Sequence, residues 1–180
     1  FLGITLLQAS HPRIRSLRRK HGNARSHGNK IWRTSLVMMD FLSETPHYRD
    51  TSILDIGCGW GAVSLMLSKQ HQAKVTALDI DPLMEFILQV HCEINDCNVD
   101  FIAKDLDLLG VSELSEYHIV VGTDICFWDS TIDKNFKLVK RVMEAGCQKF
   151  LIADPGRPPF WALVDRCANS FRTEVKGRNI

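Results

Sequence analysis

Residues 53–61 read ILDIGCGWG, an apolar run that ends in an acid and then opens into a loop with glycine at every second position. A short continuous apolar run is typical of a buried parallel strand. Gly57, Gly59 and Gly61 can adopt backbone angles closed to other residues, and they let a ligand approach the main chain closely. Residues 62–67 favour a helix whose N-terminus would face that ligand. The stretch therefore predicts a nucleotide-type cofactor loop between a strand and a helix.

The spacing of the glycines separates two kinds of cofactor loop. The dinucleotide fingerprint is G-x-G-x-x-G, whereas this chain has D-x-G-x-G-x-G from Asp55 to Gly61. The position of the third glycine disfavours an NAD-dependent oxidoreductase. The identity of the cofactor then depends on the residues that follow the loop at set distances.

Segments that favour strands and helices alternate along the chain. We expect strands at 52–56, 74–79, 99–103, 118–122 and 149–153, helices near 11–19, 31–43, 62–67, 83–94, 136–143 and 161–171, and a sixth strand at 173–180. Strands separated by helices argue for an α/β fold with a mostly parallel sheet. Ligand sites in such sheets lie beyond the carboxyl ends of the strands, near the switch in strand order.

Four acids fall at or just after the ends of the first four expected strands: Asp55, Asp79, Asp105 and Asp124. The sheet would bring all four to one edge. Asp79 comes 24 residues after Asp55, close to where a Rossmann-like fold places the acid that binds ribose hydroxyls. Asp is also common where strands meet turns. That preference can explain any one of these acids, but it explains the ordered set of four poorly.

The glycine loop followed by the three later acids resembles the signature of class I S-adenosylmethionine-dependent methyltransferases. The resemblance implies a Rossmann-like, doubly wound, mostly parallel sheet and S-adenosylmethionine as cofactor. The loop, with Asp55, Gly57, Gly59 and Gly61, would hold the methionine part of the cofactor. Asp79 would then hold the ribose, Asp105 would meet the adenine amino group, and Asp124 would face the methyl acceptor.

Two further stretches narrow the family. Residues 30–35, KIWRTS, resemble the W-x-x-S helix start of the family 16 methyltransferases, which include many protein-lysine methyltransferases. Residues 153–160, ADPGRPPF, resemble the D-P-G-R-P turn of the electron-transfer-flavoprotein β-subunit lysine methyltransferases and their bacterial relatives. Many of these relatives carry D-x-x-Y after the fourth strand, but residues 124–127 here are DICF, without the tyrosine hydroxyl. That departure leaves the substrate open.

Several large side chains admit a functional and a packing role. In the resemblance, Trp32 covers the cofactor, and Trp60 inside the glycine loop would lean on it, but either could be a core residue. Phe127 and Trp128 could form an aromatic wall that attracts a methylammonium-like product, or could pack in the core. Arg157 could bind an acidic substrate or the cofactor carboxylate, or could cap a strand or helix. We assign Trp32 and Trp60 to the cofactor, and Asp124 and Phe127 to catalysis.

These features predict an S-adenosylmethionine-dependent N-methyltransferase, with a protein lysine as the acceptor that the resemblance favours. One alternative is an N-methyltransferase of a small, nicotinamide-like amine. Another is a non-catalytic S-adenosylmethionine-binding interaction module. The expected partner is accordingly a protein substrate or a small amine, and nucleic acid is not expected.

Composition limits the remaining possibilities. The 180 residues fit one domain, 45% are hydrophobic, and the net charge is +1. Residues 1–39 contain no acid and carry a charge of +8, which leaves −7 on the other 141. We therefore expect a basic helical extension at 1–29, which could dock an acidic partner or be a solvated face, and a cofactor-binding methyltransferase domain at 30–180.

Other classes of site are not indicated. No apolar run approaches the ~18 residues of a membrane span. The six cysteines form no C-x-x-C pair, the histidines show no ligand spacing, and so no metal site is predicted. Unpaired cysteines are typical of a reducing compartment, and we expect a cytoplasmic location.

The resemblance also raises the question of the last strands of the sheet. Class I methyltransferases usually close the sheet with an antiparallel hairpin after the fifth strand. Residues 173–180 suffice for one strand, so we expect this chain to lack the last one. An unpaired sheet edge invites pairing with another chain. We therefore expect either that the natural protein continues past Ile180 or that this chain dimerises or aggregates through that sheet; the oligomeric state itself is left open.

Overall fold

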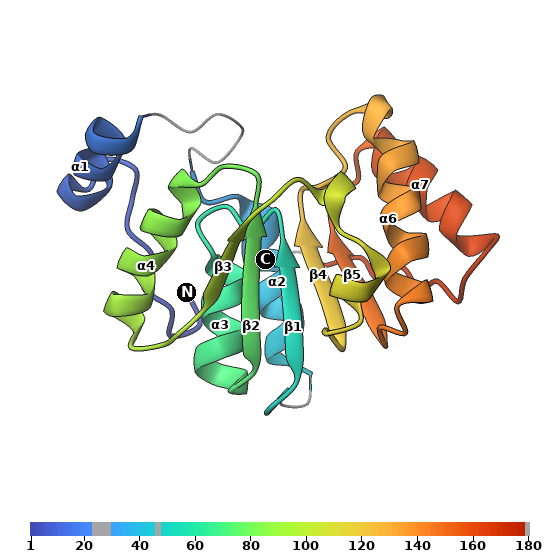
Figure 1. Ribbon diagram of the computed structural model, residues 1–180, viewed down its shortest axis with the longest axis horizontal. Coiled ribbons are helices and arrows are strands. Elements are labelled where there is room, and N and C mark those ends of the chain that lie inside the picture. The colour runs from blue at the N-terminus through green and yellow to red at the C-terminus, as the bar shows by residue number, and fades with distance from the viewer. Residues whose placement is uncertain (23–29, 46–47, 179–180) are drawn as a thin grey trace.

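The fold is built on one parallel sheet. The computed structural model describes residues 1–22, 30–45 and 48–178. Its five strands are β1 (Ser52–Ile56), β2 (Lys74–Asp79), β3 (Asp100–Ala103), β4 (Ile119–Thr123) and β5 (Lys149–Ala153). All neighbours pair in parallel in the order β3-β2-β1-β4-β5 (Figure 1). The order reverses between β1 and β4, which places a switch point at the carboxyl ends of these two strands.

Helices cover both faces of the sheet. They are α1 (Pro12–His21), α2 (Arg33–Ser43), α3 (Ala62–His71), α4 (Leu83–Asn95), α5 (Val111–Leu114), α6 (Ile132–Glu144) and α7 (Pro158–Ala168), with short 3-10 turns η1 (Leu106–Leu108) and η2 (Asp129–Thr131). Successive strand residues point to opposite faces. Ile53 of β1 accordingly packs with α2 and α3, whereas Leu54 packs with α5 and α6. The predicted doubly wound α/β architecture is confirmed.

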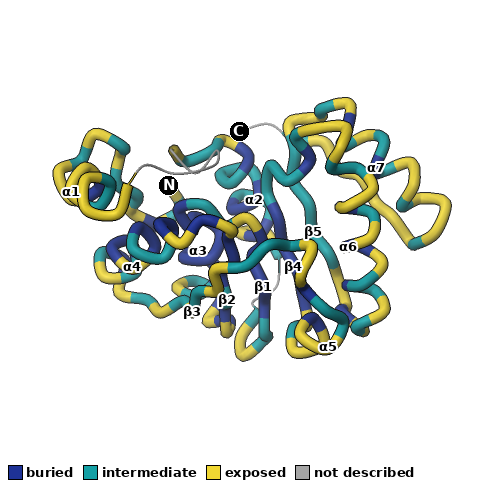
Figure 2. The backbone as a smooth tube through the Cα atoms, turned by 45° about the horizontal axis from the view of Figure 1, so that its top comes forward, coloured by how far each residue is buried: buried dark blue, intermediate teal, exposed yellow. Residues whose placement is uncertain are grey.

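The expected strand bounds agree closely with the structure. Those of β1, β2 and β5 are as predicted, β3 begins one residue later than expected, and β4 both begins and ends one residue later. The central strands β1 and β4 are buried along most of their length, as Figure 2 shows. A strand buried on both faces needs apolar side chains at nearly every position, so the continuous apolar runs marked these strands reliably.

The expected sixth strand at 173–180 is not formed by residues 173–178, which have no regular secondary structure. Instead, Arg178 lies across α2, where it forms ion pairs with Asp40 and Glu44 and faces the Phe41 ring. The segment has a single large apolar residue, the half-exposed Val175, and so offers little to bury against the sheet. The described chain thus leaves β5 at an edge of the sheet. Pairing through this edge stays a prediction.

The N-terminal residues run along α4. Thr5 exchanges two main-chain hydrogen bonds with the Asn95 side chain, both at 2.8 Å, and the Leu7 N–H donates to His91 Nε2 at 3.0 Å. Helix α1 then packs against α4 through the fully buried Ile14. The expected domain division at 29/30 borders residues 23–29, which lie outside the described part, and it stays a prediction. Within the described residues, no helix is both long enough and apolar enough to cross a membrane.

Candidate active site

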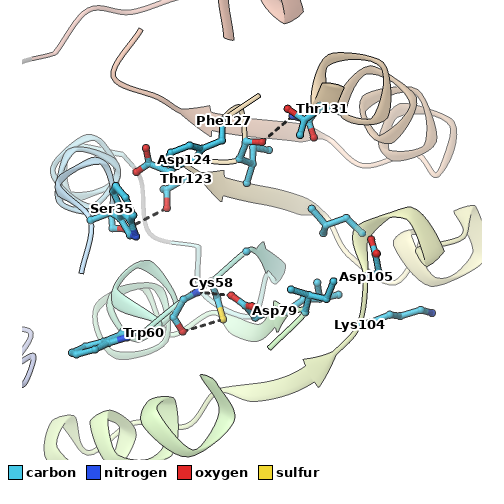
Figure 3. Close-up of a pocket in the computed structure, with 18 of the residues that line it drawn as sticks. Ser35, Cys58, Trp60, Asp79, Lys104, Asp105, Thr123, Asp124, Phe127 and Thr131 are labelled. Carbon is cyan, nitrogen blue, oxygen red and sulfur yellow. Dashed lines mark hydrogen bonds between the residues drawn. The ribbon is translucent and has the colours of Figure 1, made fainter. Parts of the chain in front are cut away.

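A cavity of about 370 Å³ lies at the carboxyl ends of β2, β3 and β4, beneath the start of α2. Its volume falls within the range of about 300–1,000 Å³ common for small-molecule sites. The lining includes most of the residues that the sequence singled out: Trp32, Gly57, Gly59, Trp60, Asp79, Asp105, Asp124 and Phe127. Asp55 and Gly61 lie behind this surface. Figure 3 shows Asp124 and Phe127 across the cavity from Asp79.

The glycine loop opens to the cavity at Gly59 and closes against the helices at Gly61. Both have a positive φ, +54° and +77°. A Cβ on Gly59 would meet no protein atom within 4 Å, so a ligand can approach the main chain there. A Cβ on Gly61 would overlap Leu88 Cδ1 of α4, so this glycine serves close packing of α3 and α4.

Asp79 ties the end of β2 to the glycine loop. Its Oδ2 accepts a hydrogen bond from the Gly59 N–H, and its Oδ1 accepts one from the Asp81 N–H, both at 3.0 Å. Burial raises the pKa of Asp79, against the effect of these two N–H donors. The neighbouring Ile80 lines the cavity and is 58% exposed. Asp79, which holds the loop and faces the cavity, is thus followed by an apolar side chain, Ile80, that is more than half exposed.

Asp55 supports the loop from below. Its carboxylate is buried and accepts a hydrogen bond from Ser64 Oγ in α3 at 2.5 Å. Burial raises the pKa of Asp55 to about 7, although the hydrogen bonds from Ser64 oppose the shift. Asp55 joins β1 to the first turns of α3 and does not line the cavity.

Asp105 follows β3 and caps the short turn η1. Its Oδ1 accepts a hydrogen bond from the Asp107 N–H at 3.0 Å. Both Asp105 and the adjacent Leu106 line the cavity. The site therefore has an acid and an apolar side chain after β3, as it has Asp79 and Ile80 after β2.

The predicted aromatic residues divide into two groups. Trp32, immediately before α2, meets Phe127 edge to face, with ring centroids 5.5 Å apart and an interplanar angle of 77°. The Trp60 side chain instead turns away from Asp124 and Phe127 (Figure 3) and packs with Ile14 and residues of α4. The structure thus shows the Trp60 side chain packed between α1 and α4. Its assignment to the cofactor stays a prediction.

Asp124 is unusual in three respects. It adopts φ +57°, in the left-handed region that non-glycine residues rarely occupy. Its side chain is 6% exposed although it lines the cavity. Neither carboxylate oxygen has a hydrogen-bond partner among the described residues. Its neutralising contact is an ion pair, with Arg157 Nη1 2.7 Å from Oδ1.

Arg157 was left open between a binding and a structural role, and the structure gives it three contacts. Besides Asp124, its Nη1 lies 2.7 Å from Asp154 Oδ2, and its Cζ lies 4.0 Å from the centroid of the Phe127 ring. Partial burial by itself would lower the pKa of Arg157, but the two carboxylates outweigh it and raise that pKa. Arg157 therefore links the turn after β5 to the loop after β4.

Some lining residues were not predicted as site residues. Ser35 Oγ and Thr123 Oγ1 are hydrogen-bonded at 3.2 Å and join α2 to β4 (Figure 3). Ile80 directly follows the strand-end acid Asp79, just as Leu106 follows Asp105, and that adjacency could have identified Ile80. In the described part of the chain, no group of three or more His, Cys, Asp or Glu side chains could hold a metal ion.

Comparison with known proteins places this site in a family. The family model described as "Methyltransferase domain" matches residues 53–146, which run from β1 through α6. The electron transfer flavoprotein β subunit lysine methyltransferase of Xenopus laevis is 30% identical over 131 residues, 72% of this chain and 52% of that protein. The human protein of the same name is 28% identical over 130 residues, 72% of this chain and 49% of that protein. The chain thus spans about half the length of these curated relatives.

Solved structures agree on the fold alone. Precorrin-6y C5,15-methyltransferase from Geobacter metallireducens aligns with a TM-score of 0.56 at 14% identity, over 75% of this chain and 69% of that one. A precorrin 8W decarboxylase from Methanobacterium thermoautotrophicum gives the same TM-score and the same shares at 13% identity. The glycine loop, the strand-end acids and the family model together indicate S-adenosylmethionine as the cofactor. The chain belongs to the methyltransferase domain family, and its sheet and glycine loop are those of the class I enzymes.

Proposed function

We propose that the protein transfers the methyl group of S-adenosylmethionine to a nitrogen, and that the acceptor is a protein lysine. The observation that carries this proposal is the Asp124 carboxylate, which is buried, faces the cavity and, beyond its ion pair with Arg157, has no hydrogen-bond partner among the described residues. Buried polar atoms are normally hydrogen-bonded, so such a group is a candidate for a ligand contact. An acceptor amine would supply the missing donors.

The cavity fits S-adenosylmethionine. The open main chain at Gly59 suits the methionine portion, and the Asp79 carboxylate suits two vicinal ribose hydroxyls. Ile80 and Leu106 offer apolar contact for an adenine ring, whose amino group Asp105 would accept. Trp32 would cover the cofactor from the start of α2. Asp55 and Gly61 would act on the cofactor through the loop that they support.

When bound, S-adenosylmethionine supplies an electrophilic methyl group. The amine must be neutral to attack, and positive charge develops on its nitrogen as the new bond forms. Asp124 would orient the amine and stabilise that charge, which is the kind of electrostatic effect that contributes most to many enzymes. The Trp32–Phe127 pair would hold the amine in line and exclude water, so that much of the rate comes from orientation.

A protein lysine is favoured over a small amine by the named relatives, which are lysine methyltransferases at 28–30% identity over 130–131 residues. The test is to incubate a cell extract with radioactive S-adenosylmethionine and either the wild-type chain or Asp124→Asn. Labelled lysine in a protein, present with wild type and lost with the variant, would support the proposal. Label confined to small molecules would support the nicotinamide-like alternative. Cofactor binding without any labelling would support an interaction module.

Two broader expectations belong with this proposal. Residues 1–29 would form an extension to a cofactor-binding domain at 30–180, and the protein would work in the cytoplasm. All six cysteines are free thiols, which suits a reducing compartment. Imaging a fluorescent fusion in cells would test the compartment.

A further inference from the structure

Arg157 contacts three side chains from two loops beside the proposed acceptor site although it does not line the cavity. Its guanidinium is 2.7 Å from Asp124 and 2.7 Å from Asp154, and it lies over the Phe127 ring at 4.0 Å. One guanidinium and two carboxylates leave this cluster with one net negative charge. A site with that charge still attracts a cation, but far less strongly than two unpaired carboxylates would.

The turn after β5 fixes where the guanidinium lies. Asp154 Oδ1 accepts hydrogen bonds from the N–H groups of Gly156 and Arg157, at 2.9 and 2.8 Å, and the Asp154 side chain is fully buried. Arg157 precedes two prolines at the start of α7, whose rings restrict the main chain. The guanidinium is thus held from its own turn, and its contacts with the loop after β4 are made from a rigid base.

Asp124 needs such a partner. Its left-handed conformation carries a steric cost for a residue with a Cβ. A buried carboxylate without a compensating charge would cost more and would turn toward solvent. Among the described residues, the Arg157 ion pair is what opposes both tendencies while leaving the hydrogen-bonding capacity of Asp124 unused.

The contact between Phe127 and Trp32 depends on the same guanidinium. A planar cation over an aromatic face is attracted to the ring, and more strongly where water is excluded. Here Arg157 covers the Phe127 ring, while Trp32 meets that ring edge to face. The arginine therefore sets the plane of Phe127, and through it the contact that joins the loop after β4 to the start of α2.

We propose that Arg157 is the positioning residue of the methyl-acceptor site: it holds Asp124 toward the cavity, fixes the Phe127 ring, and leaves the site one net negative charge for an incoming amine. The inference rests on the proposed function for its role in catalysis, but its structural part can be tested alone. Lysine can replace arginine here only in part, because it keeps the charge but lacks the planar fork that joins two carboxylates and stacks on a ring.

The experiment compares wild type with Arg157→Gln and Arg157→Lys. The matched control is Arg166→Gln, which removes an exposed arginine of α7 that pairs with Asp133. S-adenosylhomocysteine affinity is measured by calorimetry, kcat and KM by methyl transfer to the labelled acceptor, and the position of Asp124 by a crystal structure of each variant with S-adenosylhomocysteine. Thermal melts confirm that each variant is folded.

We expect S-adenosylhomocysteine affinity to stay within about twofold in all variants, because Arg157 lies outside the cavity lining. In Arg157→Gln we expect kcat to fall about 10- to 100-fold, because the buried Asp124 carboxylate loses its ion-pair partner and with it its position at the cavity. Arg157→Lys should recover part of this loss, and Arg166→Gln should match wild type. The Arg157→Gln crystal structure should show Asp124 out of the left-handed region and Phe127 rotated from Trp32.

Asp124 and Phe127 unmoved in the Arg157→Gln structure would overturn the inference, as would an unchanged kcat. Wild-type protein that binds S-adenosylhomocysteine but methylates nothing would refute the proposed function alone. In that case the crystal structures would still decide whether Arg157 positions Asp124.

Discussion

Removing the charge of Asp79 should weaken cofactor binding more than any other single change at the ends of β1 to β3. The carboxylate already accepts hydrogen bonds from the N–H groups of Gly59 and Asp81, one on each oxygen. In Asp79→Asn, one oxygen is replaced by an NH₂ group, which cannot accept. One of the two N–H groups then loses its partner, whichever way the amide turns.

The expected magnitude has two parts. A hydrogen bond to a charged acceptor contributes about 1.5–3 kcal/mol, and this is what the ribose hydroxyls would lose. Since ~1.4 kcal/mol corresponds to a tenfold change in Kd, the Kd for S-adenosylhomocysteine should rise about 10- to 150-fold. The unpaired N–H group loosens the glycine loop at Gly59, so the upper part of this range is expected.

The assay is calorimetric titration of S-adenosylhomocysteine into wild type, Asp79→Asn and a control, Asp100→Asn. Asp100 is an exposed acid of the neighbouring strand β3, and it lies at the opposite end of the sheet from the cavity. The control should bind like wild type. If Asp79→Asn also binds within twofold of wild type, Asp79 does not hold the ribose, and the cofactor lies elsewhere in the cavity.

Three further changes probe the other parts of the site. Asp124→Asn should lower kcat about 100-fold with little change in S-adenosylmethionine affinity, because the charge acts on the acceptor nitrogen; steady-state kinetics beside calorimetry would separate the two, and an equal loss of affinity would reassign the residue. Gly61→Ala should destabilise the fold by about 2–4 kcal/mol in urea unfolding, through the positive φ and the overlap with Leu88. Asp55 has a folded pKa of about 7 against an ordinary 3.8, so the folded state binds the extra proton between these values and the free energy of unfolding falls as pH rises through them. Asp55→Asn keeps an acceptor for Ser64 and should remove most of the difference in stability between about pH 5 and about pH 8, whereas an unchanged pH dependence would assign it to another group.

The cofactor half of the site could be predicted because its signals are local in sequence. Each strand is mostly apolar, and each acid comes at or just after the end of its apolar run. Parallel pairing then brings those ends to one edge without further information. The prediction extended too far at residues 173–178, where the sequence permits a strand but the Arg178 ion pairs on α2 hold the chain elsewhere.

The acceptor half could not be predicted in the same way because its contacts join distant segments. Arg157 meets Asp124 across 33 residues of sequence, and Trp32 meets Phe127 across 95. Neither pairing has a spacing rule, since each depends on how loops after β4 and β5 and the start of α2 meet in space. Trp60 shows the converse, because a position inside the glycine loop did not reveal that its side chain packs with α1 and α4.

Under the proposed function, Phe127 limits which methyl acceptor the site can bind. Many members of the family that the sequence resembles have tyrosine at this position, and its hydroxyl could hydrogen-bond an acid or an amine. Phenylalanine offers the acceptor no hydrogen bond, and its ring is occupied by Arg157 and by the edge of Trp32. The hydrogen-bonding capacity for an amine would therefore fall on the Asp124 carboxylate, whose partner within the described chain is the Arg157 ion pair and which has no further hydrogen-bond donor there. A neutral amine with N–H groups to donate fits such a site, and a substrate that offers only acceptors does not. The missing hydroxyl thus makes the charge and position of Asp124 more important, and with them the arginine beside it.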